Sequence, residues 1–167
     1  MTIHELNTLP TEELRQALYN CCGSTTWVNK MISLLPMEEL VELMDFAEEQ
    51  WFSCSEADWR EAFSQHPRIG DTASLNNKFP STAQWAGAEQ QGVNVARQQT
   101  LKLLEEGNKT YEEKFGYIFI VSASGKSADE MLHSLNARLQ NNAAEELTIA
   151  AEEQNKITLL RLQKLMQ

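Results

Sequence analysis

The sequence predicts an all-α fold: a single-domain helical bundle of about eight helices over residues 1–167, with one short extended segment near 117–122. Apolar residues recur every three or four positions over nearly the whole chain, which is the spacing of an amphipathic helix. The breaks between these stretches carry capping residues, glycine or proline. A chain of 167 residues suits one domain and is long enough to bury a sizeable core.

Four helices are predicted within the first 65 residues. The first is expected to begin at its cap Thr11 and to end at Gly23, and the second to run from about Ser24 to Leu35. Pro36 marks the start of the third, and a capping box of Ser55 with Asp58 that of the fourth. Pro36 is expected in the first turn of the third helix, where a missing backbone N–H is tolerated. The apolar spacing predicts that this third helix buries Leu40, Met44, Ala47 and Trp51.

The helical pattern breaks between His66 and Pro80, and a loop of this length inside a compact domain is often functional. Beyond it, glycines divide the helical sequence into pieces, at Gly92, Gly107 and Gly116. We therefore expect a short helix through Glu89 and Gln90, a longer one over 93–106 and another short one over 111–115.

The run from Tyr117 to Val121 is β-branched and aromatic, which predicts a buried extended segment. No partner strand is predicted for it, so its backbone groups need other partners or face a ligand. Two further helices are predicted after it. Their N-terminal capping boxes lie at Ser127 with Glu130 and at Asn142 with Glu145.

The composition argues against several classes of partner. A net charge of −10 and a pI near 4.8 disfavour nucleic acid and anionic membrane surfaces. No apolar run is long enough to cross a bilayer, and no secretory signal is visible, so a cytoplasmic protein is expected. An anionic small substrate would need a local positive pocket.

Neither a metal nor a nucleotide cofactor is predicted. The three cysteines, Cys21, Cys22 and Cys54, show neither disulfide nor zinc spacing, and we expect reduced packing residues. The segment Gly125-Lys126-Ser127 resembles the end of a phosphate-binding loop, but the glycine that the full motif requires is replaced by Ile120. Lys126 and Ser127 are expected to start a helix instead.

His66 is the strongest candidate for chemistry. Pro67 disfavours a helical backbone at the preceding residue, so the fourth helix should end there and hold an imidazole on a constrained turn. Histidine titrates near neutral pH, which suits a general acid or base. A histidine that caps the helix or lies on the surface is the alternative. His4 and His133 are expected at a frayed terminus and on a helix surface.

Two further candidates remain open between structure and function. Glu89 and Gln90, between small residues, either lie on a solvated helix face or direct a carboxylate and an amide into a pocket. Arg161 lies in the most apolar part of the last helix. Its guanidinium either reaches water over an apolar stem or binds an anion.

Taken in order, several segments resemble the OHCU decarboxylases, which act on 2-oxo-4-hydroxy-4-carboxy-5-ureidoimidazoline (OHCU) in uric acid breakdown. The similarity covers nearly the whole chain, and the ordered set is specific although no single motif is decisive. The segments are His66-Pro67-Arg68-Ile69-Gly70, Glu89-Gln90 before a glycine, 114–117 leading into 119–121, 125–127, 136–139, and 156–157 with 160–162.

The resemblance implies a cofactor-free, all-α, homodimeric enzyme that forms (S)-allantoin and CO2 from an anionic ureidoimidazoline. It implies that His66 is the catalytic acid or base and that Glu89 orients it while binding substrate together with Gln90. Pro67 and Arg161 would contact the substrate. So would the backbone of Phe119, Ile120, Val121, Ser122 and Ala123. The family often has serine where this chain has Ala86, which puts that substrate contact in doubt.

Two other functions compete with this interpretation. One is a different ureide-pathway enzyme, such as a hydrolase that uses the same histidine and glutamate to activate water. The other is a non-catalytic helical module whose acidic surface recruits a basic partner, in which His66 and Arg161 would lie far apart or exposed.

Overall fold

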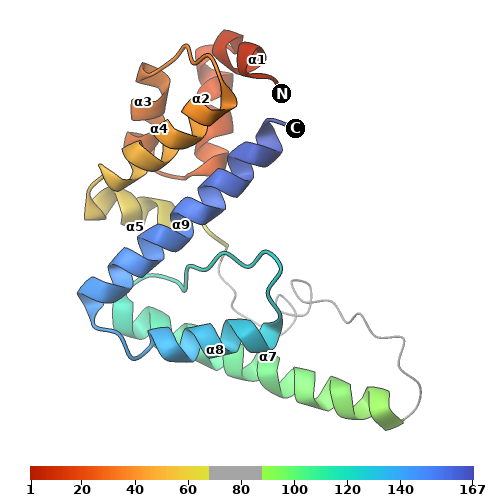
Figure 1. Cartoon of the computed structure of the whole chain (residues 1–167). Helices are drawn as coiled ribbons and strands as arrows, with labels where there is room; N and C mark the ends of the chain where they lie inside the picture. Colours follow the sequence, from red (N-terminus) through yellow and green to blue (C-terminus); the bar gives the residue numbers. More distant parts are fainter. Residues whose placement is uncertain (68–87) are drawn as a thin grey trace. The chain divides into compact units, whose positions relative to one another are not determined.

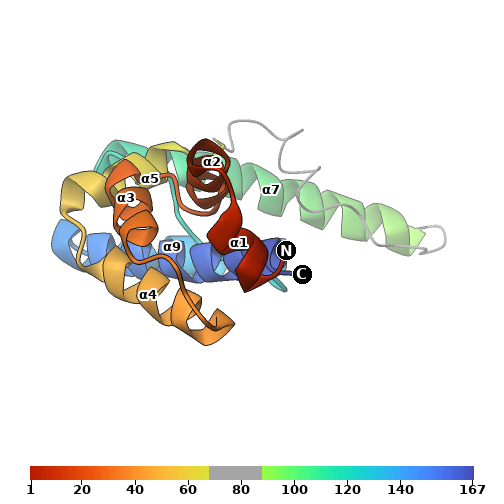
Figure 2. The same ribbon diagram turned by 90° about the horizontal axis from the view of Figure 1, so that it is seen from above.

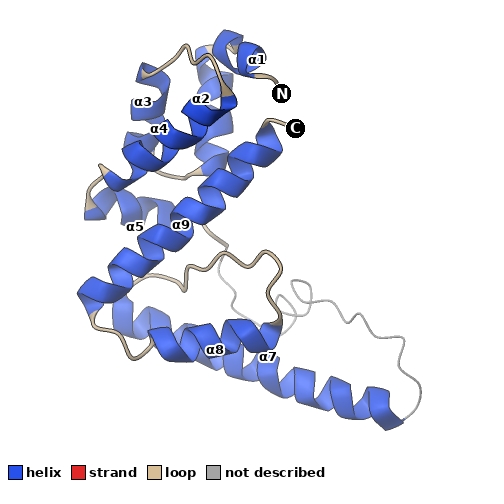
Figure 3. Cartoon of the chain, viewed as in Figure 1, coloured by secondary structure: helices blue, strands red, loops and turns tan. Residues whose placement is uncertain are grey.

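The computed structural model describes residues 1–67 and 88–167. This part of the chain holds eight α-helices joined by loops and turns, with no strand among the residues described (Figure 3). The all-α prediction is therefore confirmed. The chain divides into two compact units, and one domain over 1–167 stays a prediction. The predicted loop after Pro67 and the residue Ala86 lie outside the described residues.

The first unit comprises 1–66, 120–122 and 147–167. It contains five short helices and most of a long one: α1 (Ile3–Thr8), α2 (Thr11–Cys21), α3 (Thr25–Ser33), α4 (Leu40–Phe52), α5 (Glu56–Ser64) and α9 (Ala143–Leu165). Helix α3 packs against α2, α4 and α5. Two buried tryptophans tie the unit together, because the Trp27 indole N–H donates to the Ala47 carbonyl at 2.9 Å and that of Trp51 to the Ala151 carbonyl at 2.8 Å. Figure 2 shows α4 beside α9.

The second unit comprises 67–119 and 123–146. Its helices α7 (Ala88–Phe115) and α8 (Ala128–Arg138) lie side by side (Figure 1). Aromatic rings fill the space near the end of α7. The Tyr111 ring lies 4.7 Å from Phe115 and 5.2 Å from Phe119, measured between ring centroids. The first residues of α9 also belong to this unit.

The helix starts that depend on capping boxes are confirmed. The hydroxyl and backbone N–H of Ser55 bond with Asp58, and Ser127 does the same with Glu130. The third predicted helix starts later than expected, since Leu40 is its first residue and Pro36 lies before it. Leu40 is 43% exposed, and Leu43 instead joins Ala47 and Trp51 in the core. The capping box of Glu39 with Glu42 overrides the proline signal there.

The predicted division at Gly92 and Gly107 is wrong, because α7 is one helix of 28 residues. Gly107 lies inside it, opposite α8. A Cβ at this position would stand 2.6 Å from Leu135 Cδ2. Glycine therefore serves close helix packing here, whereas Gly116, with φ 81°, does end the helix as predicted.

The segment after Gly116 is non-helical and buried, as predicted, with Tyr117, Phe119, Ile120 and Val121 in the core of their units. It forms no strand. The Ser122 N–H donates to Glu153 Oε2 on α9 at 2.8 Å, so a side chain takes the place of a neighbouring strand.

Candidate functional site

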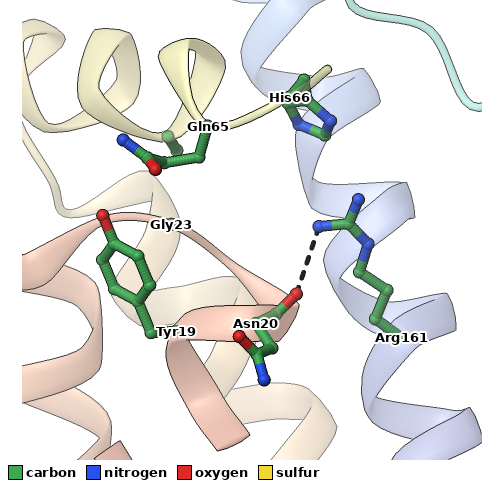
Figure 4. A pocket seen from close by; sticks show the side chains of 7 residues that line it. Tyr19, Asn20, Gly23, Gln65, His66 and Arg161 are labelled. Carbon is green, nitrogen blue, oxygen red and sulfur yellow. Dashed lines mark hydrogen bonds between the residues drawn. The ribbon is translucent and has the colours of Figure 1, made fainter. Parts of the chain in front are cut away.

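A pocket of about 260 Å³ opens in the first unit and contains both His66 and Arg161. Its lining comes from the end of α2, the end of α5 and the C-terminal part of α9 (Figure 4). The lining residues are Tyr19, Asn20, Gly23, Ala62, Gln65, His66 and Arg161. The pocket thus combines an imidazole, a guanidinium and a phenol.

Local sequence holds His66 at the pocket. Helix α5 ends at Ser64, and the His66 N–H donates to the Phe63 carbonyl at 3.3 Å in a final turn before Pro67. The predicted helix end is therefore confirmed. Gly23 lets this turn approach α2, since a Cβ there would stand 2.7 Å from Gln65 Cβ. His66 is half-buried, which gives its ring access to the pocket.

The His66 imidazole is hydrogen-bonded to a buried amide on α9. Its Nε2 lies 2.5 Å from Gln154 Oε1. Gln154 is fully buried, and its Nε2 donates to Thr158 Oγ1 at 3.2 Å. The Thr158 hydroxyl donates to the Gln154 carbonyl at 3.0 Å. We call His66, Gln154 and Thr158 the Gln154 chain.

Arg161 presents a half-buried guanidinium to the same pocket. Its Nη1 donates to the Asn20 carbonyl at 3.3 Å, as Figure 4 shows, and to the Cys21 carbonyl, also at 3.3 Å. These carbonyls end α2, where a positive charge is favourable. Among the carboxylates whose side chains are described, none forms an ion pair with Arg161. The other guanidinium nitrogens can therefore bind an anionic group in the pocket.

The three thiols near this site are buried and free of disulfides, as predicted. Burial raises the pKa of Cys22 to about 12, although hydrogen bonds with Thr158 and Ser24 oppose the effect. Burial likewise raises the pKa of Cys21 to about 11, against the charge of Arg161. Both thiols stay protonated at neutral pH, which suits packing rather than nucleophilic chemistry.

Comparison with known proteins assigns the chain to a family. The family model described as OHCU decarboxylase matches residues 7–163. The chain belongs to the OHCU decarboxylase family. The match covers all the residues that line the pocket.

Curated proteins of different lengths are similar to this chain. The chain is 40% identical to the uric acid degradation bifunctional protein TTL of Arabidopsis thaliana over 148 residues, which cover 87% of this chain and 45% of that protein. It is 25% identical to the 2-oxo-4-hydroxy-4-carboxy-5-ureidoimidazoline decarboxylase of Halalkalicoccus jeotgali over 166 residues, covering 99% and 92%. The chain therefore spans less than half of the Arabidopsis protein and most of the Halalkalicoccus protein.

A solved structure of an OHCU decarboxylase has the same fold. It was determined by crystallography in the presence of (S)-allantoin. It matches with a TM-score of 0.71 and 40% sequence identity, covering 89% of this chain and 95% of that one.

Of the residues that the OHCU decarboxylase resemblance assigns to the site, the structure brings only some to the pocket. His66 and Arg161 line one pocket, and Pro67 is exposed beside it in sequence. Glu89 and Gln90 belong to α7, but their side chains lie outside the described part, as does Ala86. Phe119, Ile120 and Val121 are buried, and Ser122 and Ala123 are half-buried. Their predicted roles toward substrate stay predictions.

Sequence reasoning found Arg161 on α9 but missed Gln154 and Thr158. These two recur with Arg161 at helical spacing, on the side that meets His66 and the pocket. That spacing is the signal that could have found them. In the described ranges, no three His, Cys, Asp or Glu side chains converge as metal ligands, and no helix is long and apolar enough to cross a membrane.

Proposed function

We propose that this chain converts OHCU to (S)-allantoin and CO2 without a cofactor, as one OHCU decarboxylase domain over 1–167. Membership of the OHCU decarboxylase family supports the proposal. The observation that carries it is the single pocket that His66 and Arg161 share. A homodimer in the cytoplasm is the assembly and location we propose with it.

The substrate can supply the electron sink for this reaction. The bond between the ring carbon and its carboxylate breaks, and the electron pair passes into the adjacent C=N unit of the imidazoline ring. The hydroxyl on that ring carbon loses its proton and becomes a carbonyl. The nitrogen of the former C=N unit takes up one proton and the neighbouring carbon, which bears the ureido group, takes up another. CO2 leaves, so the substrate carboxylate anion gains one proton overall. The protein needs to bind an anion, move protons and present one face of the ring.

Two side chains that line the pocket suit the first two of these tasks. Arg161 binds a negatively charged or carbonyl oxygen of the substrate through guanidinium N–H groups that do not bond to α2. His66 exchanges the proton, a step that contributes about 10²–10⁴-fold. Glu89 orients His66 and binds substrate with Gln90, and Pro67 contacts the substrate. The backbone of Phe119, Ile120, Val121, Ser122 and Ala123 binds the ring, and water takes the place of a serine hydroxyl at Ala86.

The geometry disfavours a pure interaction module. That alternative requires His66 and Arg161 to be far apart or fully exposed, whereas both are half-buried in one pocket. A hydrolase would use the same pocket to activate water, and it is distinguished by its product, because a hydrolase releases no CO2.

A coupled assay tests the proposal. Urate oxidase and hydroxyisourate hydrolase generate OHCU in situ, and circular dichroism follows chiral (S)-allantoin while CO2 release is measured in parallel. We expect the chain to accelerate both signals. His66→Asn should lower kcat about 10²–10⁴-fold, while His133→Asn, at an exposed histidine of α8, should match the parent. An allantoin signal no faster than spontaneous decay would exclude the decarboxylase.

A further inference from the structure

We propose that Gln154, held by Thr158, is a positioning residue that keeps the proton of the neutral His66 ring on Nε2. The contact is direct, at 2.5 Å between His66 Nε2 and Gln154 Oε1. It joins a half-buried ring to an amide that has no exposure to solvent. The inference deepens the proposed function, because it assigns the proton-accepting nitrogen of the general base to Nδ1.

The Thr158 hydroxyl determines which way the Gln154 amide points. A hydroxyl has one proton, and that of Thr158 is donated to the Gln154 main-chain carbonyl at 3.0 Å. Toward the Gln154 side chain, Thr158 can therefore only accept, so the NH2 group faces Thr158 at 3.2 Å. The amide oxygen must then face His66. An amide oxygen is an acceptor only, so the imidazole nitrogen beside it has to carry the proton.

Burial makes this arrangement specific. Gln154 and Thr158 are 0% and 1% exposed, so water cannot replace either partner if the amide rotates. A rotated amide would place an NH2 group against a ring N–H and two oxygens against each other. Such unsatisfied buried groups are unfavourable by about 1–3 kcal/mol each. The side chain is therefore locked in one orientation.

Among the side chains that the structure describes, the charged and titratable groups around the ring are compatible with a neutral imidazole. Tyr19 of α2 and Arg161 of α9 line the same pocket. On α9, Glu153 is engaged by Lys156 at 2.7 Å and by the Ser122 N–H. The protonated thiol of Cys22 adjoins Thr158. Arg161 disfavours a charged ring, and Gln154 stabilises a single tautomer without adding charge.

The first test reads the tautomer directly and does not require enzymatic activity. Two-dimensional ¹H–¹⁵N NMR of the imidazole rings distinguishes a protonated from an unprotonated ring nitrogen. The chain has three histidines, and the exposed His4 and His133 serve as internal references. Loss of one set of signals in His66→Asn assigns the ring. We expect neutral His66 to carry its proton on Nε2. A proton on Nδ1 would overturn the proposal, even if the chain is an active decarboxylase.

Two variants at the same position separate positioning from packing. Gln154→Leu removes the acceptor, and we expect a mixed tautomer and a fall in kcat of about 10–100-fold, the effect typical of residues that orient a functional histidine. Gln154→Glu keeps an acceptor and adds a charge, so it should retain the Nε2 proton and raise the His66 titration midpoint by about 1–3 pH units. Gln163→Glu adds the same charge at an exposed position of α9 and should leave the midpoint unchanged.

Thr158→Val supplies a second route if Gln154→Leu fails to fold. It removes the hydroxyl that orients the amide while nearly keeping the volume. We expect the His66 tautomer to become mixed, whereas Thr158→Ser should restore the parent spectrum and Thr148→Val, at an exposed threonine of α9, should not change it. A Gln154→Glu titration equal to that of Gln163→Glu would contradict the proposal. Unchanged tautomers in both Gln154→Leu and Thr158→Val would do the same.

Discussion

Two buried polar clusters, one in each compact unit, use residues of the same long helix in different ways. In the second unit, Glu146 accepts hydrogen bonds from Tyr111 Oη at 2.6 Å, Arg138 Nε at 2.6 Å and Asn141 Nδ2 at 3.0 Å. Its carboxylate is fully buried. We call these four residues the Glu146 cluster. In the first unit, the Gln154 chain also joins buried polar groups, but it ends at a half-buried imidazole in a pocket.

The difference lies in where each set of hydrogen bonds ends. Both carboxylate oxygens of Glu146 have donors, and the Arg138 guanidinium also lies 4.5 Å from the Phe119 ring centroid. Among the described contacts of the Glu146 cluster, none reaches a residue that lines the pocket. Burial raises the pKa of Tyr111 far above its usual value, and its bond to Glu146 adds to the effect, so the phenol stays a donor. Burial and polarity therefore do not indicate function by themselves. A connection to a pocket distinguishes a working cluster from a structural one.

The largest effect should come from disrupting the Glu146 cluster. Glu146→Gln removes the negative charge beside the Arg138 guanidinium, which is 8% exposed. We expect the free energy of unfolding to fall by about 3–5 kcal/mol, as when one partner of a buried ion pair is lost. Urea unfolding measures this. Glu152→Gln, at an exposed position of α9, is the control and should change it by less than about 0.5 kcal/mol. Glu146→Gln could instead shift the His66 titration midpoint and leave the free energy of unfolding unchanged. The Glu146 cluster would then act on the pocket, as the Gln154 chain does, and not on stability.

A substitution in the pocket should have the opposite effect: it should weaken substrate binding more than it lowers the free energy of unfolding. Arg161→Lys keeps the charge but loses the planar set of donors. We expect KM for OHCU to rise about 10–100-fold, which corresponds to one charge-assisted hydrogen bond. Arg60→Lys, at an exposed ion pair of α5, is the matched control. Equal KM values for Arg161→Lys and Arg60→Lys would show that Arg161 does not bind the substrate.

The parts of the fold that sequence reasoning predicted correctly are those encoded by neighbouring residues. The capping boxes at Ser55, Ser127 and Asn142 each join residues three positions apart, so their signal is complete within the segment. Gly107 could not be interpreted in this way. It is inside a helix because Leu135 approaches it from α8, and that contact is tertiary.

The candidate site shows the same limit. His66 is predicted because Pro67 ends the helix there and holds an imidazole on a constrained turn, and Arg161 because it interrupts an apolar stretch. The only local signal of Gln154 is its helical spacing from Thr158 and Arg161, and an amide between acidic and polar residues otherwise resembles a solvated helix face. Only the packing of the end of α5 against α9 brings an imidazole to it.

Helix packing in the second unit offers a smaller test. In an exposed helix, alanine is favoured over glycine by about 1 kcal/mol. Gly107→Ala should nevertheless destabilise the protein by about 1–3 kcal/mol, because the new methyl group would overlap Leu135 Cδ2. Thermal unfolding measures the change. Combined with Leu135→Val, the loss should be less than additive. An increase in stability would mean that α8 can move away and that this contact does not restrain the second unit.

The smallest expected effect is the loss of stability at alkaline pH that comes from the buried thiols beside the Gln154 chain. It reports how well this part of the interior excludes solvent. The pKa of Cys22 is about 12 and that of Cys21 about 11 in the folded chain, against an ordinary value near 9. Below pH 9 the thiols are protonated in both folded and unfolded chains, so their contribution to stability is fully present. Between about pH 9 and 12 the unfolded chain ionises first, and stability falls. Urea midpoints from pH 8 to 11 should therefore decline, and the decline should be shallower in Cys22→Ala. Cys54→Ala, at a less buried thiol, is the control. If both variants followed the parent curve, solvent would reach Cys22, and Thr158 beside it would have water as an alternative partner.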